Sequence, residues 1–97
     1  MSESRVESYL RKEVRKAKGA CYKFKSPGRR HVPDNIVLWP EIPHPRTEFV
    51  ECKNKGKRAR KGQQREHVRL MKLGYDVFLI DTKEKVDLYV KGELPCL

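Results

Sequence analysis

The spacing of hydrophobic side chains divides the chain into helical and extended segments. Residues 3–18 carry apolar side chains at helical intervals, which predicts an amphipathic helix with one buried stripe. Ser2 or Ser4 fits the N-cap of this helix, and Gly19 fits its C-terminal end. The stripe consists of Val6, Leu10, Val14 and Ala17.

Shorter apolar stretches bounded by turn-forming residues predict four strands. Turn chemistry at Ser26-Pro27-Gly28 separates the first two strands, and the prolines at 40, 43 and 45 predict an exposed loop before the third. The predicted strands are residues 20–25, 35–39, 47–53 and 75–81.

Two more helices follow from the same kind of pattern. Residues 62–73 predict a helix that ends at Gly74, with a buried stripe of Val68, Met71 and one of Leu70 or Leu73. Thr82 fits the cap of a final helix that runs to Val90, and residues 91–97 form an irregular tail.

The resulting order is helix, three strands, helix, strand, helix. Successive strands favour an antiparallel meander, and the helix between the third and fourth strands makes that pair parallel. We therefore expect an α/β fold with a mixed sheet flanked by helices. The length predicts one domain over 1–97, with its core over about 3–90.

The charge points to a polyanionic partner. Lys and Arg number 23 against 13 Asp and Glu, a net charge of +10. Such an excess suits nucleic acid, because phosphate contacts release counterions; a merely soluble basic protein is the alternative. No apolar run is long enough to span a membrane. Three cysteines without metal-ligand spacing indicate reduced thiols in a cytoplasmic protein.

The candidate chemistry lies at Asp34, just before the second strand, and at Glu51 and Lys53 in the third. Alternation along a strand places Glu51 and Lys53 on one face. Two carboxylates suit a hard cation such as Mg²⁺ or Mn²⁺, with the backbone carbonyl of Cys52 as a neutral ligand. Lys53 can then orient a water or neutralise phosphate charge. An ordinary salt bridge of Lys53 with Asp34 or Glu51 is the alternative.

Two basic stretches flank this motif. They precede Asp34 and follow Lys53, which favours contacts with nucleic acid over the alternative of a localisation signal for the second stretch. The predicted DNA-binding residues are Arg29, Arg30, His31, Lys55, Lys57, Arg58, Arg60 and Lys61.

Taken together, these motifs resemble the VRR-NUC (virus-type replication-repair nuclease) family of the PD-(D/E)XK nuclease superfamily. The likeness covers roughly residues 3–90. It is carried by Glu7, Tyr22-Lys23-Phe24, Ser26-Pro27-Gly28, Val32-Pro33-Asp34, Phe49-Val50-Glu51-Cys52-Lys53, Gly56, Gln63 eleven residues before Gly74, and Tyr75-Asp76-Val77-Phe78.

The resemblance implies a restriction-endonuclease-like core and Mg²⁺- or Mn²⁺-dependent cleavage of DNA. It makes Glu7, Asp34, Glu51 and Lys53 the active centre, with Glu7 reaching the ion through water and Gln63 in support; helical spacing also permits Gln64 in place of Gln63. Small stand-alone members, often from phages, look like homodimers that cut branched DNA such as four-way (Holliday) junctions in DNA repair, which implies a location in the bacterial host cytoplasm.

One position departs from the family pattern. The family commonly has Gly before Val-Pro-Asp, where this chain has His31; this changes the turn or adds a phosphate contact. His31 and His67 are expected to be solvated rather than catalytic bases. Two other readings stay open: a non-catalytic basic DNA-binding module, and a nuclease-like scaffold for protein interactions.

Overall fold

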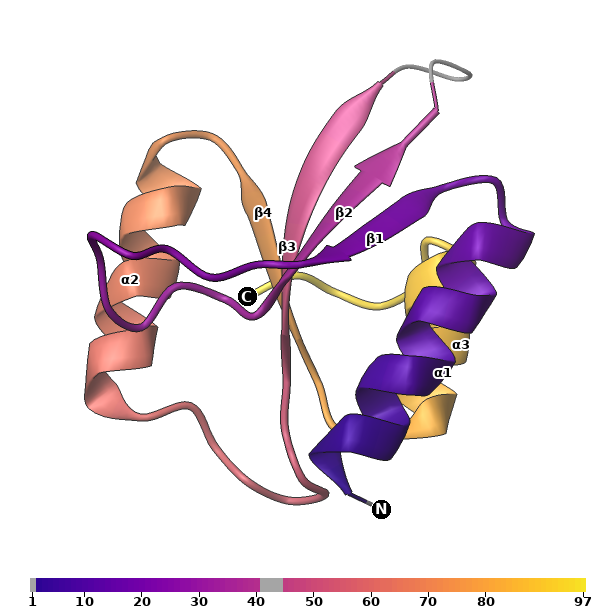
Figure 1. The fold of residues 1–97 in the computed structure, drawn as a ribbon, viewed down its shortest axis with the longest axis horizontal. Coiled ribbons are helices and arrows are strands. Elements are labelled where there is room, and N and C mark those ends of the chain that lie inside the picture. Colours follow the sequence, from indigo (N-terminus) through magenta and orange to yellow (C-terminus); the bar gives the residue numbers. More distant parts are fainter. Residues whose placement is uncertain (1, 41–44) are drawn as a thin grey trace.

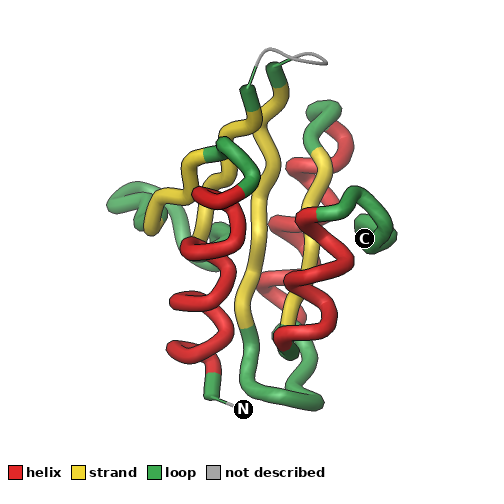
Figure 2. Tube along the Cα trace, turned by 90° about the vertical axis from the view of Figure 1, so that its right-hand side faces the viewer, coloured by secondary structure: helices red, strands yellow, loops and turns green. Residues whose placement is uncertain are grey.

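The computed structural model describes residues 2–40 and 45–97, and it shows a four-stranded sheet with helices on both faces (Figure 1). Helices α1 and α3 lie against one face and α2 against the other; Figure 2, viewed from the α1 and α3 side, shows these two in front of the strands. The elements are α1 (Glu3–Lys16), β1 (Ala20–Lys23), β2 (Asn35–Trp39), β3 (Arg46–Cys52), α2 (Lys61–Lys72), β4 (Asp76–Ile80) and α3 (Lys83–Val90).

The sheet has the predicted mixed topology. Its strand order is β1-β2-β3-β4, with the first two pairs antiparallel and β3 parallel to β4. In the β2–β3 register, Asn35 is paired with Val50. The two strands run in opposite directions, so the residue before Asn35 is opposite the residue after Val50. Asp34 therefore lies opposite Glu51. The α/β class and the element order predicted from the sequence are confirmed.

Helix α1 buries the predicted stripe but ends earlier than expected. Val6, Leu10 and Val14 are fully buried, and the Ser2 hydroxyl accepts a hydrogen bond from the Arg5 amide, so Ser2 is the cap. Lys18, with φ of 73°, adopts the left-handed conformation just after the helix, at the end where Gly19 was expected to lie.

Gly19 serves a different purpose, which is close packing. A Cβ atom at this position would lie 2.8 Å from the ring of Trp39 and 2.9 Å from Val14. Such distances are well inside van der Waals contact, so a larger residue between α1 and β1 would force Trp39 or Val14 to shift.

The buried stripe predicted for α2 is largely wrong. Val68 and Leu73 are 45% and 61% exposed, whereas Glu66 and His67 are buried. The N-terminal half of α2 packs against the rest of the protein through polar residues, because it contacts the candidate site through Gln63 and the loop before β2 through Glu66. Leu70 and Met71, further along, are half-buried.

The remaining segments agree with the predictions where the structure describes them. Thr82 caps α3, and residues 91–97 form neither helix nor strand, although the Leu97 amide bonds the Val77 carbonyl at 2.8 Å. The predicted proline loop falls mostly on 41–44, outside the described residues. The cysteines are free. Over the described ranges, the helices are too short or too polar to cross a bilayer.

Candidate active site

Asp34 and Glu51 form a pair of partly desolvated carboxylates where β2 and β3 meet. Asp34 Oδ1 accepts hydrogen bonds from the Cys52 amide at 3.1 Å and from the Asn35 side chain at 2.9 Å. Glu51 is only 4% exposed. Its Oε1 atom is buried without a hydrogen-bond partner among the described residues. A buried oxygen of this kind is costly unless something binds it.

Burial raises the pKa of both groups. The pKa of Asp34 is raised to about 6, mainly by desolvation and further by the charge of Glu7. The pKa of Glu51 is raised to about 8, again by desolvation first and then by the negative charge of Asp34. The charges of Lys23 and Lys53 lower the pKa of Asp34 and of Glu51 respectively, but they do not offset the effect of burial.

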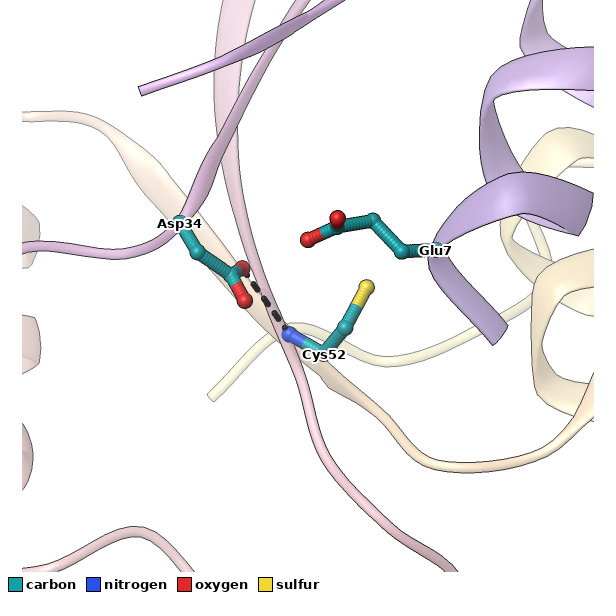
Figure 3. Close-up of side chains that lie close together, drawn as sticks. All are labelled: Glu7, Asp34 and Cys52. Atoms are coloured by element: carbon teal, nitrogen blue, oxygen red, sulfur yellow. Dashed lines mark hydrogen bonds between the residues drawn. The ribbon is translucent and has the colours of Figure 1, made fainter. Parts of the chain in front are cut away.

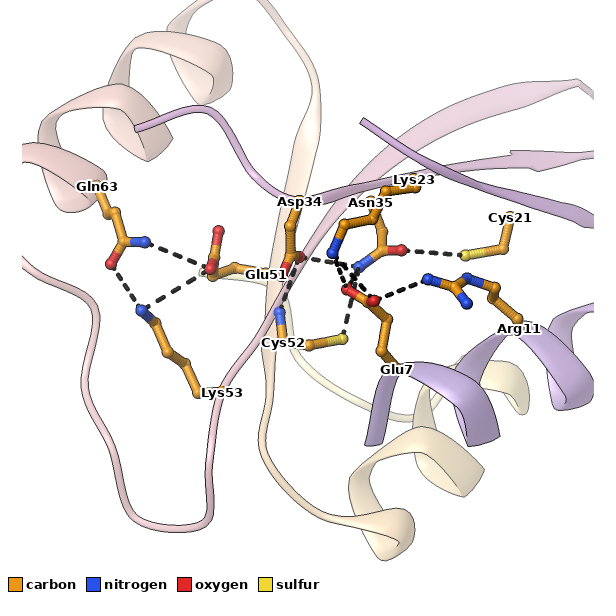
Figure 4. A network of polar contacts seen from close by, with 10 residues as sticks. All are labelled: Glu7, Arg11, Cys21, Lys23, Asp34, Asn35, Glu51, Cys52, Lys53 and Gln63. Atoms are coloured by element: carbon orange, nitrogen blue, oxygen red, sulfur yellow. Dashed lines mark hydrogen bonds and ion pairs between the residues drawn. The ribbon is translucent and has the colours of Figure 1, made fainter. Parts of the chain in front are cut away.

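Lys53, Gln63 and Glu51 form a triangle of polar contacts on the α2 side of the sheet (Figure 4). The ammonium of Lys53 donates to Gln63 Oε1 at 2.9 Å and lies 3.8 Å from Glu51 Oε2. The Gln63 amide donates to Glu51 Oε2 at 3.3 Å. The ion pair between Lys53 and Glu51 is thus the longest of three polar contacts that join Glu51, Lys53 and Gln63.

The geometry distinguishes between the two candidate glutamines. Gln63 also accepts a hydrogen bond from the Arg60 amide at 2.9 Å, which fixes its side chain at the start of α2. Gln64 is exposed and donates instead to the Ala59 carbonyl. Gln63 is therefore the one that contacts Glu51 and Lys53.

Glu7 reaches the same region from α1 and is already surrounded by donors. Its oxygens lie 3.0 and 2.9 Å from the Lys23 ammonium, 2.7 Å from Arg11 and 3.0 Å from the Asn35 amide. Burial opposes ionisation, but the hydrogen bonds from Lys23 and Asn35 and the charges of Lys23 and Arg11 lower the pKa of Glu7 overall. Glu7 is thus a satisfied carboxylate, unlike Asp34 and Glu51.

Cys52 faces Glu7 rather than Glu51, as strand alternation predicts. One oxygen of Glu7, one of Asp34 and the Cys52 sulfur all lie within 4.8 Å of one another (Figure 3). Asp34 therefore stands between two groups of ligands, with Glu51 on one side and Glu7 with Cys52 on the other.

Three residues of this network lay outside the predicted active centre: Arg11, Lys23 and Asn35. Arg11 lies one helical turn after Glu7, a spacing that the sequence displays. Lys23 and Asn35 are partners across β1 and β2, and this relationship requires the strand register. Lys23 belongs to a motif that carries the family resemblance, but nothing in that motif indicates its contact with Glu7.

The loop before Asp34 is docked on α2. His31 has φ of 67°, in the left-handed region where glycine is favoured, and its ring lies against Gly62, where a Cβ atom would come within 2.6 Å. Arg29 forms a 2.7 Å ion pair with the buried Glu66. The backbone at position 31 thus suits the glycine common in the family, and the histidine ring adds a contact with α2.

Comparison with known proteins was made by sequence and by structure. No family model matches the sequence. The chain is 45% identical over 82 residues to a protein named "Putative nuclease p44" of Acyrthosiphon pisum secondary endosymbiont phage 1, covering 84% of this chain and 85% of that one. A solved structure described as a VRR_NUC domain superposes with a TM-score of 0.83 at 28% identity, covering 94% of this chain and 97% of its own. The chain belongs to the VRR-NUC nuclease family.

The exposed basic loop of this VRR-NUC chain lies between β3 and α2. Lys55, Lys57, Arg58, Arg60 and Lys61 are all exposed, and among the described residues none of them forms an ion pair. Hydrogen bonds to other elements help to hold the loop: Gly56, in the left-handed region, donates to Asp81 at 2.9 Å, and Asn54 accepts from the Glu3 amide at 2.6 Å.

A second basic surface adjoins the site. Its residues line a hollow of about 340 Å³ next to the first turn of α2. Arg29 is partly neutralised there by Glu66, whereas Arg30 and Arg65 are exposed without such a contact in the described chain. The hollow is lined by Arg29, Arg30, His31, Gly62, Arg65 and Glu66.

His67 differs from the expectation of a solvated side chain, which was wrong. It is 2% exposed, and its Nε2 atom is buried without a hydrogen-bond partner in the part of the chain that the structure describes. Burial, together with the charge of Lys53, lowers the pKa of His67. It is therefore a buried histidine one turn after Gln63. The polarity of histidine alone did not reveal this placement.

Proposed function

We propose that this VRR-NUC chain is a metal-dependent DNA endonuclease that hydrolyses phosphodiester bonds at Asp34, Glu51 and Lys53. The observation that carries the proposal is the unpaired, buried oxygen of Glu51 beside Asp34. Burial raises the pKa of both carboxylates, and the charge of Glu7 raises the pKa of Asp34 further, as that of Asp34 does for Glu51. A divalent cation would stabilise both groups in their charged form.

The donor set fits a hard cation. Asp34 and Glu51 would hold Mg²⁺ or Mn²⁺ together with the carbonyl of Cys52, because such ions prefer oxygen ligands and retain waters. The bound ion would supply the acidity that makes water nucleophilic and the charge that neutralises the phosphate. Cys52 also donates its amide to Asp34, which fixes the orientation of that carboxylate.

Lys53 has the geometry of a positioned cation. The contact with Gln63 holds its ammonium beside Glu51, and only 13% of the Lys53 side chain is exposed to solvent. A fixed charge in a partly dry site stabilises developing negative charge without reorganisation. In this proposal Lys53 orients the attacking water or faces the phosphate, and Gln63 keeps it there.

Contact with DNA is assigned to the two basic surfaces on either side of the motif. The loop residues Lys55, Lys57, Arg58, Arg60 and Lys61 are exposed and unneutralised within the described chain, as are Arg30 and Arg65 beside the hollow. Arg29 and His31 would contribute mainly by holding the loop before Asp34 against α2.

We further propose that the substrate is branched DNA and that the working form is a homodimer. Family resemblance supports both. A four-way junction presents two equivalent strands, and a two-fold dimer would place two active sites on them symmetrically.

The test is a cleavage panel with duplex, flap and four-way junction DNA, with and without Mg²⁺ or Mn²⁺. We expect metal-dependent nicking that Glu51→Gln abolishes while DNA affinity is kept, since the change removes a negative charge. Glu93→Gln, at an exposed carboxylate in the tail, is the matched control and should cleave normally. Full cleavage by Glu51→Gln, or binding without any metal-dependent product, would favour a non-catalytic DNA-binding module instead.

A further inference from the structure

We infer that Lys23 is a built-in cation that takes the place of a second metal ion at Glu7, so that the site accepts a single ion, at Asp34 and Glu51. This inference rests on the proposed metal-dependent function and specifies how many ions the protein binds. It assigns to Lys23 the role of a positioning residue.

The ligand spacing beside Glu7 would otherwise suit an ion. Glu7, Asp34 and Cys52 each present one ligand atom, and these atoms lie within 4.8 Å of one another. Two carboxylates with waters are a sufficient set for Mg²⁺ or Mn²⁺. The side chains alone would therefore predict two neighbouring ions that share Asp34.

Lys23 already pairs with the Glu7 carboxylate. Its ammonium contacts both oxygens of Glu7, at 2.9 and 3.0 Å, and its side chain is half-exposed over a carboxylate that is only 10% exposed (Figure 4). A divalent ion could bind Glu7 only by displacing this ammonium or by lying next to it. The second arrangement places two positive charges in close contact, which is unfavourable in a partly buried site.

The strand pairing keeps Lys23 in place. Its register partner, Asn35, is fully buried and donates to both Glu7 and Asp34. The Glu51 side has no equivalent: Lys53 is directed to Gln63, and Glu51 Oε1 stays unpaired among the described residues. The two sides of Asp34 are therefore unequal: the Lys23 ammonium contacts both oxygens of Glu7, whereas the Lys53 ammonium lies 3.8 Å from Glu51 Oε2 and leaves Oε1 without a partner among the described residues.

The experiment counts bound Mn²⁺ in the full chain by electron paramagnetic resonance of the free ion, with circular dichroism as the check on folding. Wild-type protein should bind one ion and Lys23→Met two. Lys23→Arg, which keeps the charge, and the double variant Lys23→Met with Glu7→Gln, which removes the new ligand, should each bind one. Lys25→Met removes the same charge at an exposed neighbour and should also bind one.

The outcomes separate this inference from the proposed function. Two ions in the wild type, or one ion in folded Lys23→Met, would overturn the role of Lys23 and leave metal dependence intact. Wild-type protein that binds no Mn²⁺ at all would overturn the proposed function and this inference with it.

Discussion

The side-chain oxygen of Gln63 lies 2.9 Å from the ammonium nitrogen of Lys53 and accepts a hydrogen bond from it. The same glutamine donates to Glu51 from its nitrogen, at 3.3 Å. One residue at the start of α2 thus orients both charged side chains at the end of β3. Helix α2 is in this way part of the candidate site, although it contributes no charged group to the motif itself.

Gln63→Leu should lower the rate of DNA cleavage by about 10- to 100-fold, the usual cost of removing a residue that orients a metal ligand. The reason is that Lys53 and Glu51 lose their common partner. Single-turnover cleavage at saturating Mn²⁺ measures the effect. Gln64→Leu is the control, since Gln64 bonds only to the Ala59 carbonyl, and equal losses in both variants would contradict a specific role for Gln63.

The metal-free protein should become less stable as the pH rises. The folded-state pKa values of Asp34 and Glu51, about 6 and about 8, lie above their ordinary values of 3.8 and 4.5. The folded state therefore binds protons more tightly than the unfolded state, and stability falls as pH increases from the ordinary values through the raised ones. Thermal melts in metal-free buffer from about pH 4.5 to about pH 8.5, a range that spans the ordinary pKa of Glu51 and both raised pKa values, measure this slope.

A substitution at Glu51 and the addition of Mn²⁺ should each change this pH dependence. Glu51→Gln should flatten the upper part of the slope, whereas Glu93→Gln should leave it unchanged. Added Mn²⁺ should raise the melting temperature more at the alkaline end than at the acidic end, because the ion binds the deprotonated carboxylates. Because the lowered pKa of His67 contributes a slope of the opposite sign, the decisive comparison is between variants: equal pH slopes for wild type and Glu51→Gln would contradict a desolvated carboxylate at Glu51.

Gly19→Ala should destabilise the fold by about 1–3 kcal/mol, the typical cost of overpacking. The added methyl group would meet the Trp39 ring and Val14 at less than van der Waals distance. Gly28→Ala is the matched control because nothing lies within 4 Å of a Cβ atom there, and it should change stability by no more than about 0.5 kcal/mol. Urea unfolding measures both; equal effects would show that the contact with Trp39 is not tight.

Lys57→Gln should weaken DNA binding and reduce the salt dependence of the association constant. A lost phosphate contact lowers the slope of log K against log salt by about 0.9 for duplex DNA. Titrations of catalytically inactive Glu51→Gln protein, with and without the second change, measure this slope. Lys91→Gln removes an equal exposed charge just after α3 and should leave the slope unchanged; a similar reduction there would indicate that only net charge matters.

The sequence by itself determined the features that depend on local periodicity. The stripe of Val6, Leu10 and Val14 follows from helical spacing, and strand alternation places Glu51 and Lys53 on the face opposite Cys52. These patterns were enough for the α/β class, the element order and the shared face of Glu51 and Lys53, because each depends on the periodicity of side chains within single elements.

Only the tertiary structure decided which distant residues meet. The choice of Gln63 over Gln64, the burial of Glu66 and His67 in place of Val68, and the contact of Lys23 with Glu7 all depend on how α2 and β1 are placed against the site. Strand register and helix docking depend on contacts between segments that are distant in the sequence, and the pattern within one element does not specify which residues of another element it meets. For this reason two glutamates beside Asp34 have different surroundings: both oxygens of Glu7 accept hydrogen bonds, whereas Glu51 Oε1 has no partner among the described residues.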